Sequence, residues 1–325
     1  SDGDPLIPSR LLLGWDSDTR VRRLDAFYRT SGTDADVQSL LLVPGDKTTF
    51  YPTAPPPDDD TPLPDRLSVT GFRDYIACPY RFYLRRVLKL AGPTEPGDEM
   101  DGALFGTLGH DVLQRFGESK EATSKKPSVI EDCLFQALEE LAAERFGNDP
   151  RPALSVQLDQ LRLRLHHFAS AQARIVSAGW SIHSIELDER VPFDVDGIPF
   201  TLSGRIDRID VHPKHGVRII DYKTSDTAKT PEQTHRRAKT DWLDLQLPLY
   251  RELARPLGLE GPVELAYFNL PRRPEELRLS VAEWVDEEID EAVDHARAII
   301  RVIRRRRFWP PGDPSQYGDE FVRLC

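Results

Sequence analysis

The chain has 325 residues, a length that suits one large domain or two medium ones. Hydrophobic residues make up 39% and charged residues 30%, a composition typical of a folded protein rather than a disordered one. No apolar run reaches the roughly 20 residues that a membrane helix needs, and the N-terminus lacks the order of a signal peptide, so we expect a cytoplasmic protein. Its three widely spaced cysteines exclude a disulfide framework and a four-cysteine metal site.

The charge is unevenly distributed. The net charge of −11 argues at first against a polyanionic partner, but residues 1–65 hold 12 acidic and only 6 basic residues of the total. Residues 297–309 contain six arginines and no acid. Interactions beyond about 8 to 10 Å are screened at physiological salt, so a locally basic face can bind phosphates on an acidic protein.

A segment rich in proline and aspartate divides the chain. Residues 52–65 contain six prolines and four aspartates, which stiffen a chain and cannot build a core, so we predict a linker there. Residues 1–51 are expected to form a leader or accessory segment, because some 50 residues rarely make an independent core. The main domain is expected over residues 66–325.

The hydrophobic pattern predicts helices, then strands, then helices. The first helices are expected near residues 68–90, 103–116, 128–146 and 152–178. Strands are expected at residues 182–193, 200–211 and 217–223, separated by turns. A helix at 241–257, a strand at 263–270 and a helix at 281–308 follow. This order predicts an α/β protein.

The most informative residues lie on two of the predicted strands. Side chains alternate along a strand, so Asp221 and Lys223 share one face, which can simply be its solvated side. Asp207 lies on the preceding strand, and antiparallel pairing through the turn at residues 212–216 can bring it near Asp221. Two carboxylates and a lysine would then converge.

Such a cluster suggests a specific chemistry. Two hard oxygen ligands suit Mg²⁺ or Mn²⁺, which takes one or two protein carboxylates and keeps several waters. Lys223 beside that ion could orient or deprotonate an attacking water, or neutralise the anion that develops at phosphorus. Together these groups favour phosphodiester hydrolysis.

Asp207 followed by Asp221-Tyr222-Lys223 resembles the signature of PD-(D/E)XK nucleases, in the form found in RecB and AddB nuclease domains. The resemblance covers most of residues 66–325. An isolated Asp and Asp-x-Lys are a weak signal, so the other motifs of the family are needed to judge whether the resemblance is significant.

Three further segments match AddB-type domains in the expected order. Residues 68–84 resemble the opening of these domains. Gly106-Thr-Leu-Gly-His110 resembles their Gly-x-x-x-His helix, and Gln246-Leu-Pro-Leu-Tyr250 resembles their Gln-x-x-x-Tyr motif. Five elements in this order are a strong signal.

The resemblance implies a restriction-endonuclease-like α/β core, with a mixed central sheet flanked by helices. It also implies that His110, Asp207 and Asp221 bind the metal, and that the backbone carbonyl of Ile220 or Tyr222 completes its shell. Taken alone, a histidine on a helix rich in Leu and Val is more often a buried residue with a satisfied partner.

The resemblance implies roles for three more side chains. Lys223 would serve the attacking water, while Gln246 and Tyr250 would position that lysine or the strand being cut. Gln246 and Tyr250 are four residues apart and share a helix face, which ordinary packing also explains. Pro248 between them fits the first turn of a helix or forces a kink.

The cysteines depart from the AddB pattern. Nucleases of that type often carry an iron–sulphur cluster, held by one cysteine before the core and three near the C-terminus. Cys78 matches the first position and Cys325 the last, but Gln316 and Asp319 stand where the other two thiolates belong. We therefore expect no iron–sulphur cluster, and we expect Cys78 to be a small buried residue.

Two groups of arginines are candidates for contact with the DNA backbone. The first group is Arg81, Arg85 and Arg86. The second group is Arg304, Arg305, Arg306 and Arg307, at the end of the last predicted helix. Arginine at a helix terminus also complements the helix dipole, but four in a row exceed that need.

The resemblance implies a Mg²⁺- or Mn²⁺-dependent deoxyribonuclease, an exonuclease acting at DNA ends in recombinational repair. Residues 8–12 also look like the stretch that precedes the nuclease in AddB-type proteins, which implies a helicase partner or a longer helicase–nuclease chain. Two alternatives stay open. One is a catalytically silent module that binds DNA ends or acts as a scaffold, and the other is a CRISPR-adaptation nuclease of the same superfamily.

Overall fold

In the computed structural model the chain divides into two units, Ser1–Pro52 and Thr53–Cys325. The structure describes residues 18–19, 22, 56–58, 60–91, 99–237 and 241–312, and the elements below lie in the second unit. Nearly all of the predicted leader and part of the predicted linker fall outside these residues, so both boundaries stay predictions. None of the helices in the described part is long and apolar enough to cross a membrane.

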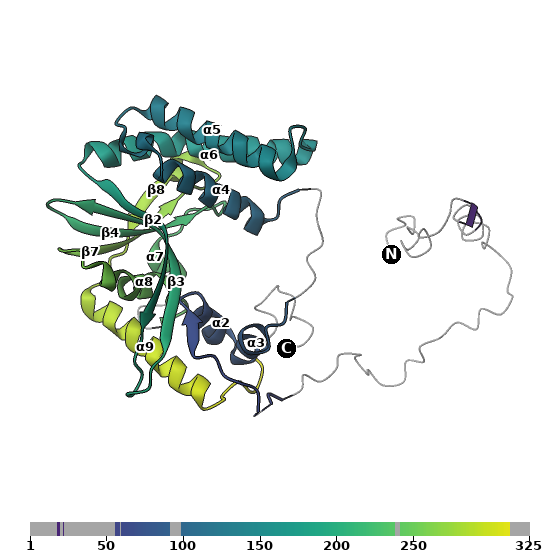
Figure 1. The fold of residues 1–325 in the computed structure, drawn as a ribbon, viewed down its shortest axis with the longest axis vertical. Coiled ribbons are helices and arrows are strands. Elements are labelled where there is room, and N and C mark those ends of the chain that lie inside the picture. Colours follow the sequence, from purple (N-terminus) through teal and green to yellow (C-terminus); the bar gives the residue numbers. More distant parts are fainter. Residues whose placement is uncertain are drawn as a thin grey trace. The chain divides into compact units, whose positions relative to one another are not determined.

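A mixed sheet forms the centre of the second unit (Figure 1). Its main path runs β1 (Arg66–Ser68), β3 (Thr201–His212), β4 (Gly216–Lys223), β7 (Val263–Asn269) and β8 (Arg278–Val281), with β2 (Ser181–Pro192) paired to β3. The β1–β3 and β4–β7 pairs are parallel, and the β2–β3, β3–β4 and β7–β8 pairs are antiparallel. The predicted mixed central sheet is confirmed.

Helices cover both faces of this sheet (Figure 1). The helices are α2 (Gly71–Ala77), α3 (Pro79–Phe82), α4 (Gly102–Gly117), α5 (Pro127–Phe146), α6 (Pro152–Ser177), α7 (Pro231–His235), α8 (Gln246–Ala254) and α9 (Asp286–Arg304). Short helical turns are η2 (Tyr83–Val87), η3 (Lys120–Thr123), η4 (Arg255–Leu257) and η5 (Pro274–Glu276). Two very short strands, β5 (Arg236–Arg237) and β6 (Asp241–Trp242), pair with each other apart from the main sheet.

Two hydrophobic clusters hold these layers together. Helices α4, α5 and α6 pack on one face of the sheet, where Ile220, Tyr222 and Phe268 are buried beneath them. Helices α2, α3, α8 and α9 pack on the other face, over Ile219 and Leu265. Neighbouring residues of β4 therefore point into different clusters, as alternation along a strand with two covered faces requires.

Three predicted boundaries were wrong. The helix expected at residues 68–90 is interrupted, because Cys78 is extended with φ of −162° and Pro79 begins a new helix, as proline often does. The helix expected from residue 241 begins at Gln246, because Asp241–Trp242 pairs with β5. The helix expected from residue 281 begins at Asp286, since Arg278–Val281 joins the sheet as β8.

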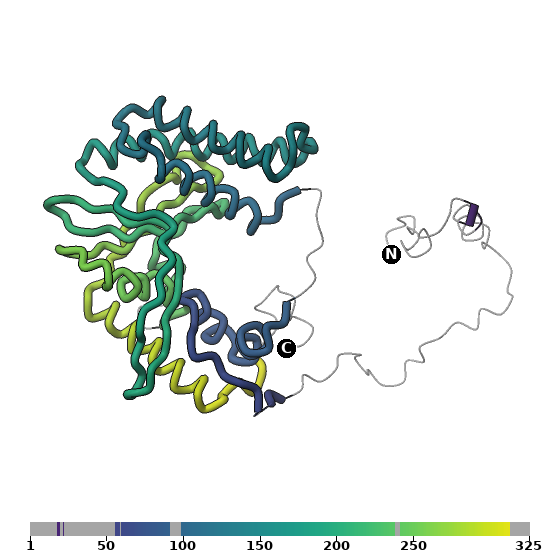
Figure 2. Tube along the Cα trace, viewed as in Figure 1, coloured from purple at the N-terminus to yellow at the C-terminus, as the bar shows by residue number. Residues whose placement is uncertain are grey.

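Strands β2 and β3 change their packing partway along their length, and they run side by side through the centre of the unit (Figure 2). Leu187 and Ile206 pack in the cluster beneath α8 and α9. Two residues along each strand, Ile185 instead lies against Gly117 of α4, and Arg208 contacts α6. Residues two apart normally share a face, so the alternation is broken between these positions. Glu186, with a left-handed φ of 46°, lies at this break.

Candidate active site

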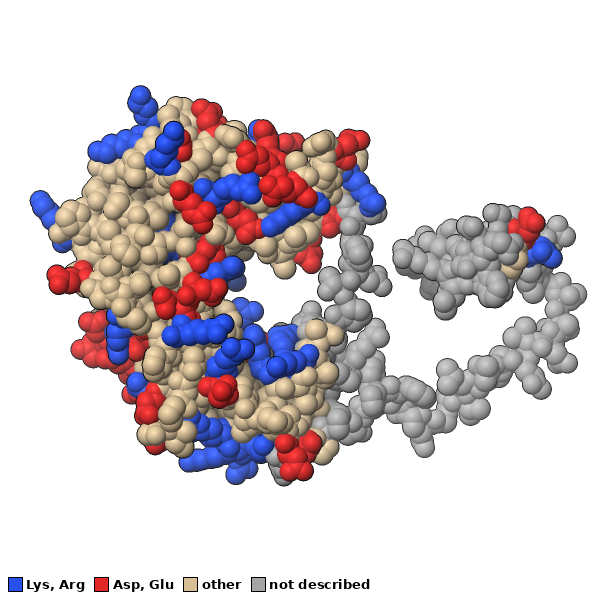
Figure 3. Space-filling view, in the orientation of Figure 1, with Lys and Arg blue, Asp and Glu red and all other residues tan. Residues whose placement is uncertain are grey.

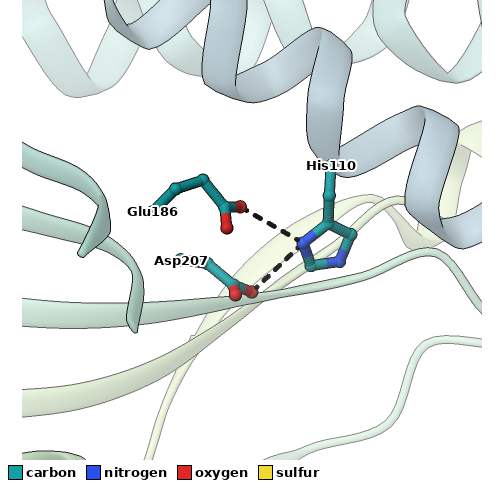
Figure 4. Close-up of side chains that lie close together, drawn as sticks. All are labelled: His110, Glu186 and Asp207. Atoms are coloured by element: carbon teal, nitrogen blue, oxygen red, sulfur yellow. Dashed lines mark ion pairs between the residues drawn. The ribbon is translucent and has the colours of Figure 1, made fainter. Parts of the chain in front are cut away.

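Three elements meet where the two long strands change their packing. The ring of His110, which hangs from α4, points toward Glu186 of β2 and Asp207 of β3 (Figure 4). Its Nδ1 is 3.5 Å from Oδ2 of Asp207 and 3.6 Å from Oε1 of Glu186. One potential ligand atom from each of the three lies within 4.8 Å of the others. Within the described residues, this is the group of three that fits a metal ion.

Small residues bring α4 close enough to place His110. A Cβ added at Gly106 would lie 3.2 Å from Oγ1 of Thr224, and one added at Gly109 would lie 3.2 Å from its Cγ2. Thr224 directly follows β4, so the helix packs its glycine face against the end of that strand. The Gly-x-x-x-His motif thus has a packing reason, because larger residues would push the histidine away from the strands.

Asp221 is held from several sides. Its Oδ2 lies 2.6 Å from Nζ of Lys223. Its Oδ1 accepts hydrogen bonds from Nε2 of Gln246 at 2.8 Å and from the hydroxyl of Tyr250 at 3.3 Å. Gln246 and Tyr250 were expected to position the lysine or the DNA strand, whereas here they contact the carboxylate that pairs with the lysine. Pro248 lies in the first turn of α8, as its ring requires.

The aspartates of the two strands are linked through the backbone. Oδ2 of Asp207 accepts a hydrogen bond of 2.8 Å from the backbone N–H of Tyr222, the residue after Asp221. Beneath them, the fully buried Arg208 donates to both carboxylate oxygens of Asp210 and to the Tyr222 hydroxyl. The structure therefore brings together the side chains predicted from the sequence on β3, β4, α4 and α8.

Comparison with known proteins assigns the family. Residues 66–316 match the model described as the PD-(D/E)XK nuclease superfamily. The chain belongs to this superfamily. The expected fold and the expected resemblance are both confirmed by this match, which spans the whole mixed sheet.

Curated relatives of this PD-(D/E)XK chain are named as a subunit of an ATP-dependent helicase/deoxyribonuclease. The one from Staphylococcus aureus strain MRSA252 is 27% identical over 257 residues, which cover 69% of this chain and 21% of the relative. The one from Carboxydothermus hydrogenoformans is 26% identical over 179 residues, 50% of this chain and 16% of the relative. The chain thus spans about a fifth of the length of these relatives. A solved structure described as that of SSO0001 aligns with 14% identity over 73% of this chain and 76% of its own, at a TM-score of 0.29.

Glu186 is the residue of the PD-(D/E)XK site that sequence reasoning missed. Pairing on either side, Ile185 with Arg208 and Leu187 with Ile206, places it across from Asp207. Its side chain is 5% exposed, and its ion pairs are with His110 and with Nε of Arg205 at 2.7 Å. A sequence signal was available in the turn at Asp196-Gly197, because antiparallel pairing through it sets an acid opposite Asp207.

The acidic surroundings control protonation at the site. Burial lowers the pKa of His110, but the nearby Glu186 carboxylate and the charge of Asp207 outweigh it and raise that pKa to about 9. Burial, reinforced by the charge of Asp221, raises the pKa of the Asp207 carboxyl. Burial lowers the pKa of Lys223, but the adjoining Asp221 more than compensates and leaves that pKa above its usual value. Lys223 is therefore an ammonium group at neutral pH.

The first candidate arginine group is engaged with the protein itself. Arg81 was expected to contact DNA, but it is 3% exposed and lies in the interior. That expectation was wrong, because Tyr80, Arg81 and Phe82 of the short helix α3 are all buried. Arg85 and Arg86 lie 3.0 Å and 2.6 Å from the carboxylate of Asp74 and remain half-buried. Basic side chains nevertheless gather over α2 and α3, at the edge of the hollow beside α4 (Figure 3).

The second candidate arginine group divides in two. Arg304 donates to the carbonyls of Val195, Ile198 and Pro199, and so ties α9 to the loop between β2 and β3. Arg306 donates to the carbonyl of Asp58. Arg305 and Arg307 have exposed side chains. Contact with DNA stays a prediction for the group and is best supported for these two.

Cys78 is buried, as expected for a small residue packed in the core. Its Sγ accepts a hydrogen bond of 3.2 Å from the backbone N–H of Gly312. Residues 316, 319 and 325, on which the expectation about the iron–sulphur cluster depends, lie outside the described residues.

Proposed function

We propose that the chain is a divalent-metal-dependent DNA nuclease that hydrolyses phosphodiester bonds. The observation that carries the proposal is the convergence of His110, Glu186, Asp207 and the Asp221–Lys223 pair at one place on the sheet. Membership of the nuclease superfamily and similarity to subunits named for deoxyribonuclease activity support DNA as the substrate.

The residues present fit a hard divalent cation such as Mg²⁺ or Mn²⁺. In the described part of the chain, neither carboxylate oxygen of the buried Glu186 makes a well-directed hydrogen bond. A nearly buried carboxylate whose partners are one arginine and an imidazole is still costly to hold ionised, and a divalent cation beside it would lower that cost. His110, Glu186 and Asp207 would hold the ion, with Asp221 and the Ile220 or Tyr222 carbonyl as further candidates. When bound, the ion would polarise the scissile phosphate and favour ionisation of the attacking water.

Each remaining side chain has a function that its contacts support. Because its pKa is raised, Lys223 is protonated and acts by charge, so it orients the water or neutralises the anion developing at phosphorus. Asp221 fixes that ammonium at 2.6 Å. Gln246 and Tyr250 fix Asp221 in turn, so they are positioning residues.

We further propose that the nuclease acts at DNA ends in recombinational repair, with a helicase partner or as part of a helicase–nuclease chain. The names of the relatives, which join a helicase to a deoxyribonuclease, support the helicase partner, and the action at DNA ends in repair rests on the resemblance to AddB-type nuclease domains. Since the chain spans only about a fifth of each relative, the helicase would be supplied by another segment or another polypeptide.

The test is digestion of end-labelled DNA, single- and double-stranded, linear and circular, with Mg²⁺, Mn²⁺ or EDTA. We expect cleavage of linear DNA that requires the metal, with circular DNA resistant. Cleavage of circles would instead indicate an endonuclease. Tight binding of ends without cleavage in either metal would overturn the nuclease proposal in favour of a silent end-binding module.

A further inference from the structure

One face of β3 carries polar side chains that lead up to the metal-binding group. Leu202 and Ile206 are buried on the core side of this strand. Thr201, Ser203 and Arg205 alternate with them and so lie on the opposite side, in line with Asp207. At about 3.3 Å per residue, this line is roughly 20 Å long from Asp207 to Thr201.

The strands on both sides of β3 add cations to this line. Arg190 of β2 pairs with Ser203, and Arg66 of β1 pairs with Thr201. Paired residues project on the same side of a sheet, so both arginines stand beside the polar line. The side chain of Arg205 continues the line to the site, because it forms the ion pair with Glu186.

The same residues line a hollow in the surface. Two cavities of about 870 and 380 Å³ adjoin here, and both are lined by Arg66, Arg86 and Arg190. Lys89 lines the larger one and Arg205 the smaller one. The acids lining them are Asp65, Asp188 and Glu189, so cations are in excess.

Three of these cations are available to a ligand. Arg86 faces Asp74, and Arg205 faces Glu186. In the described part of the chain, the exposed side chains of Arg66, Lys89 and Arg190 take part in no ion pair or hydrogen bond. Exposed arginines without carboxylate partners, lined up along a groove, are suited to successive phosphates of a polyanion.

We propose that Arg66, Lys89 and Arg190, here called the cationic row, bind the sugar–phosphate backbone of one DNA strand that extends from the metal site. This inference rests on the proposed function and adds to it the course of the substrate strand. The row contacts phosphates only, so binding is independent of base sequence.

The test compares Arg66→Ala/Arg190→Ala with the full chain in binding labelled single-stranded oligonucleotides in Ca²⁺. For a 16-nucleotide strand we expect affinity to fall at least tenfold. The slope of log affinity against log salt should fall by about 1.4, because each phosphate that is no longer neutralised on a single strand removes about 0.7. A dinucleotide, with a single internucleotide phosphate, is too short to reach from the metal site to the row and should bind both proteins alike.

Arg174→Ala/Lys214→Ala is the matched control, because both side chains are exposed and the charge change is the same. Lys214 lies in the turn at the opposite end of β3 from Thr201, and Arg174 lies in the last turn of α6. Equal losses in the two double variants, or none in the row variant, would overturn the inference. Thermal melting must show that both variants fold.

A cleavage assay separates this inference from the proposed function. We expect the row variant to raise KM for long strands and to leave kcat unchanged, because no residue of the row touches the reacting group. If the full chain cuts no DNA and the row variant still loses affinity, the row is retained and the nuclease proposal fails. If the full chain cuts DNA and the row variant binds the 16-nucleotide strand as tightly as the full chain does, the nuclease proposal is retained and the inference about the cationic row fails.

Discussion

Oε1 of Glu186 lies 3.6 Å from Nδ1 of His110, and Oδ2 of Asp207 lies 3.5 Å from the same nitrogen. The Glu186 backbone is held at φ of 46°, a region that residues with side chains rarely adopt. Such strain persists only where surrounding structure enforces it, and it is concentrated at functional sites. Here the strained residue points a carboxylate at the imidazole.

Glu186→Gln keeps the shape of this side chain and removes its charge. We expect Mn²⁺ affinity to fall about 10- to 100-fold, the usual effect of altering a group that holds or orients a metal ligand. Isothermal titration with Mn²⁺ measures this. Glu189→Gln on the same strand is the control, and the site assignment for Glu186 fails if both variants bind the ion equally.

Asp221→Ala and Lys223→Ala should each abolish most cleavage of linear DNA. Either change removes a charged group from the reacting centre, for which losses of about 10² to 10⁴ in kcat are typical. Single-turnover cleavage in Mg²⁺ measures the chemical step. Undiminished cleavage in both variants would eliminate this site.

Gln246→Ala and Tyr250→Phe should behave as members of one unit. Both side chains act on the same Oδ1 of Asp221 and also bond to each other at 2.7 Å. We expect each to slow cleavage, and the double variant to lose less than the sum of the two free energies. Fully additive losses in a double-mutant cycle would show independent functions.

Stability without metal should fall as pH rises. The pKa of His110, about 9 in the folded chain, exceeds its ordinary value of 6.5. Protonation of the ring therefore stabilises the folded state fully below about pH 6.5, and this contribution to stability is lost as the pH rises through about 9. A divalent ion replaces the proton, so Mn²⁺ should raise Tm more at pH 9 than at pH 6. Melting curves with Mn²⁺ or EDTA test this. The prediction is contradicted if Mn²⁺ shifts Tm equally at pH 6 and pH 9, or if the difference between the two pH values persists in His110→Ala.

The buried ion pair of Arg208 and Asp210 should matter for stability. Both side chains are fully buried, so Arg208→Ala leaves a carboxylate without its counter-charge. We expect a loss of about 3 to 5 kcal/mol in the free energy of unfolding, measured by urea denaturation. Adding Asp210→Ala should recover part of it. No recovery in the double variant would indicate that lost packing, not charge, is responsible.

Much of the fold and site could be predicted because the decisive signals were local. The Asp-x-Lys strand, the Gly-x-x-x-His helix and the Gln-x-x-x-Tyr helix each place a functional group by spacing within one element. The end strands β1 and β8 were missed, because three or four residues are too few to show alternation.

Glu186 and Arg81 show what spacing could not provide. Glu186 acquires its position from the register with β3 and from its left-handed backbone conformation, and the sequence of its own strand shows neither. Arg81 resembled its basic neighbours, but it lies in the short helix α3, where Tyr80 and Phe82 on either side of it are also buried. In both cases tertiary packing, not local sequence, determined the environment of the side chain.

The bond between Oδ2 of Asp207 and the amide of Tyr222 has a consequence for how knock-outs are interpreted. The antiparallel ladder between β3 and β4 ends at the pairing of Arg208 with Ile220, and at the next step the carboxylate substitutes for a backbone acceptor. Asp207→Ala would therefore remove a hydrogen bond between β3 and β4 as well as a candidate metal ligand. Asp207→Asn retains an acceptor oxygen, which makes it the cleaner probe of charge at this position.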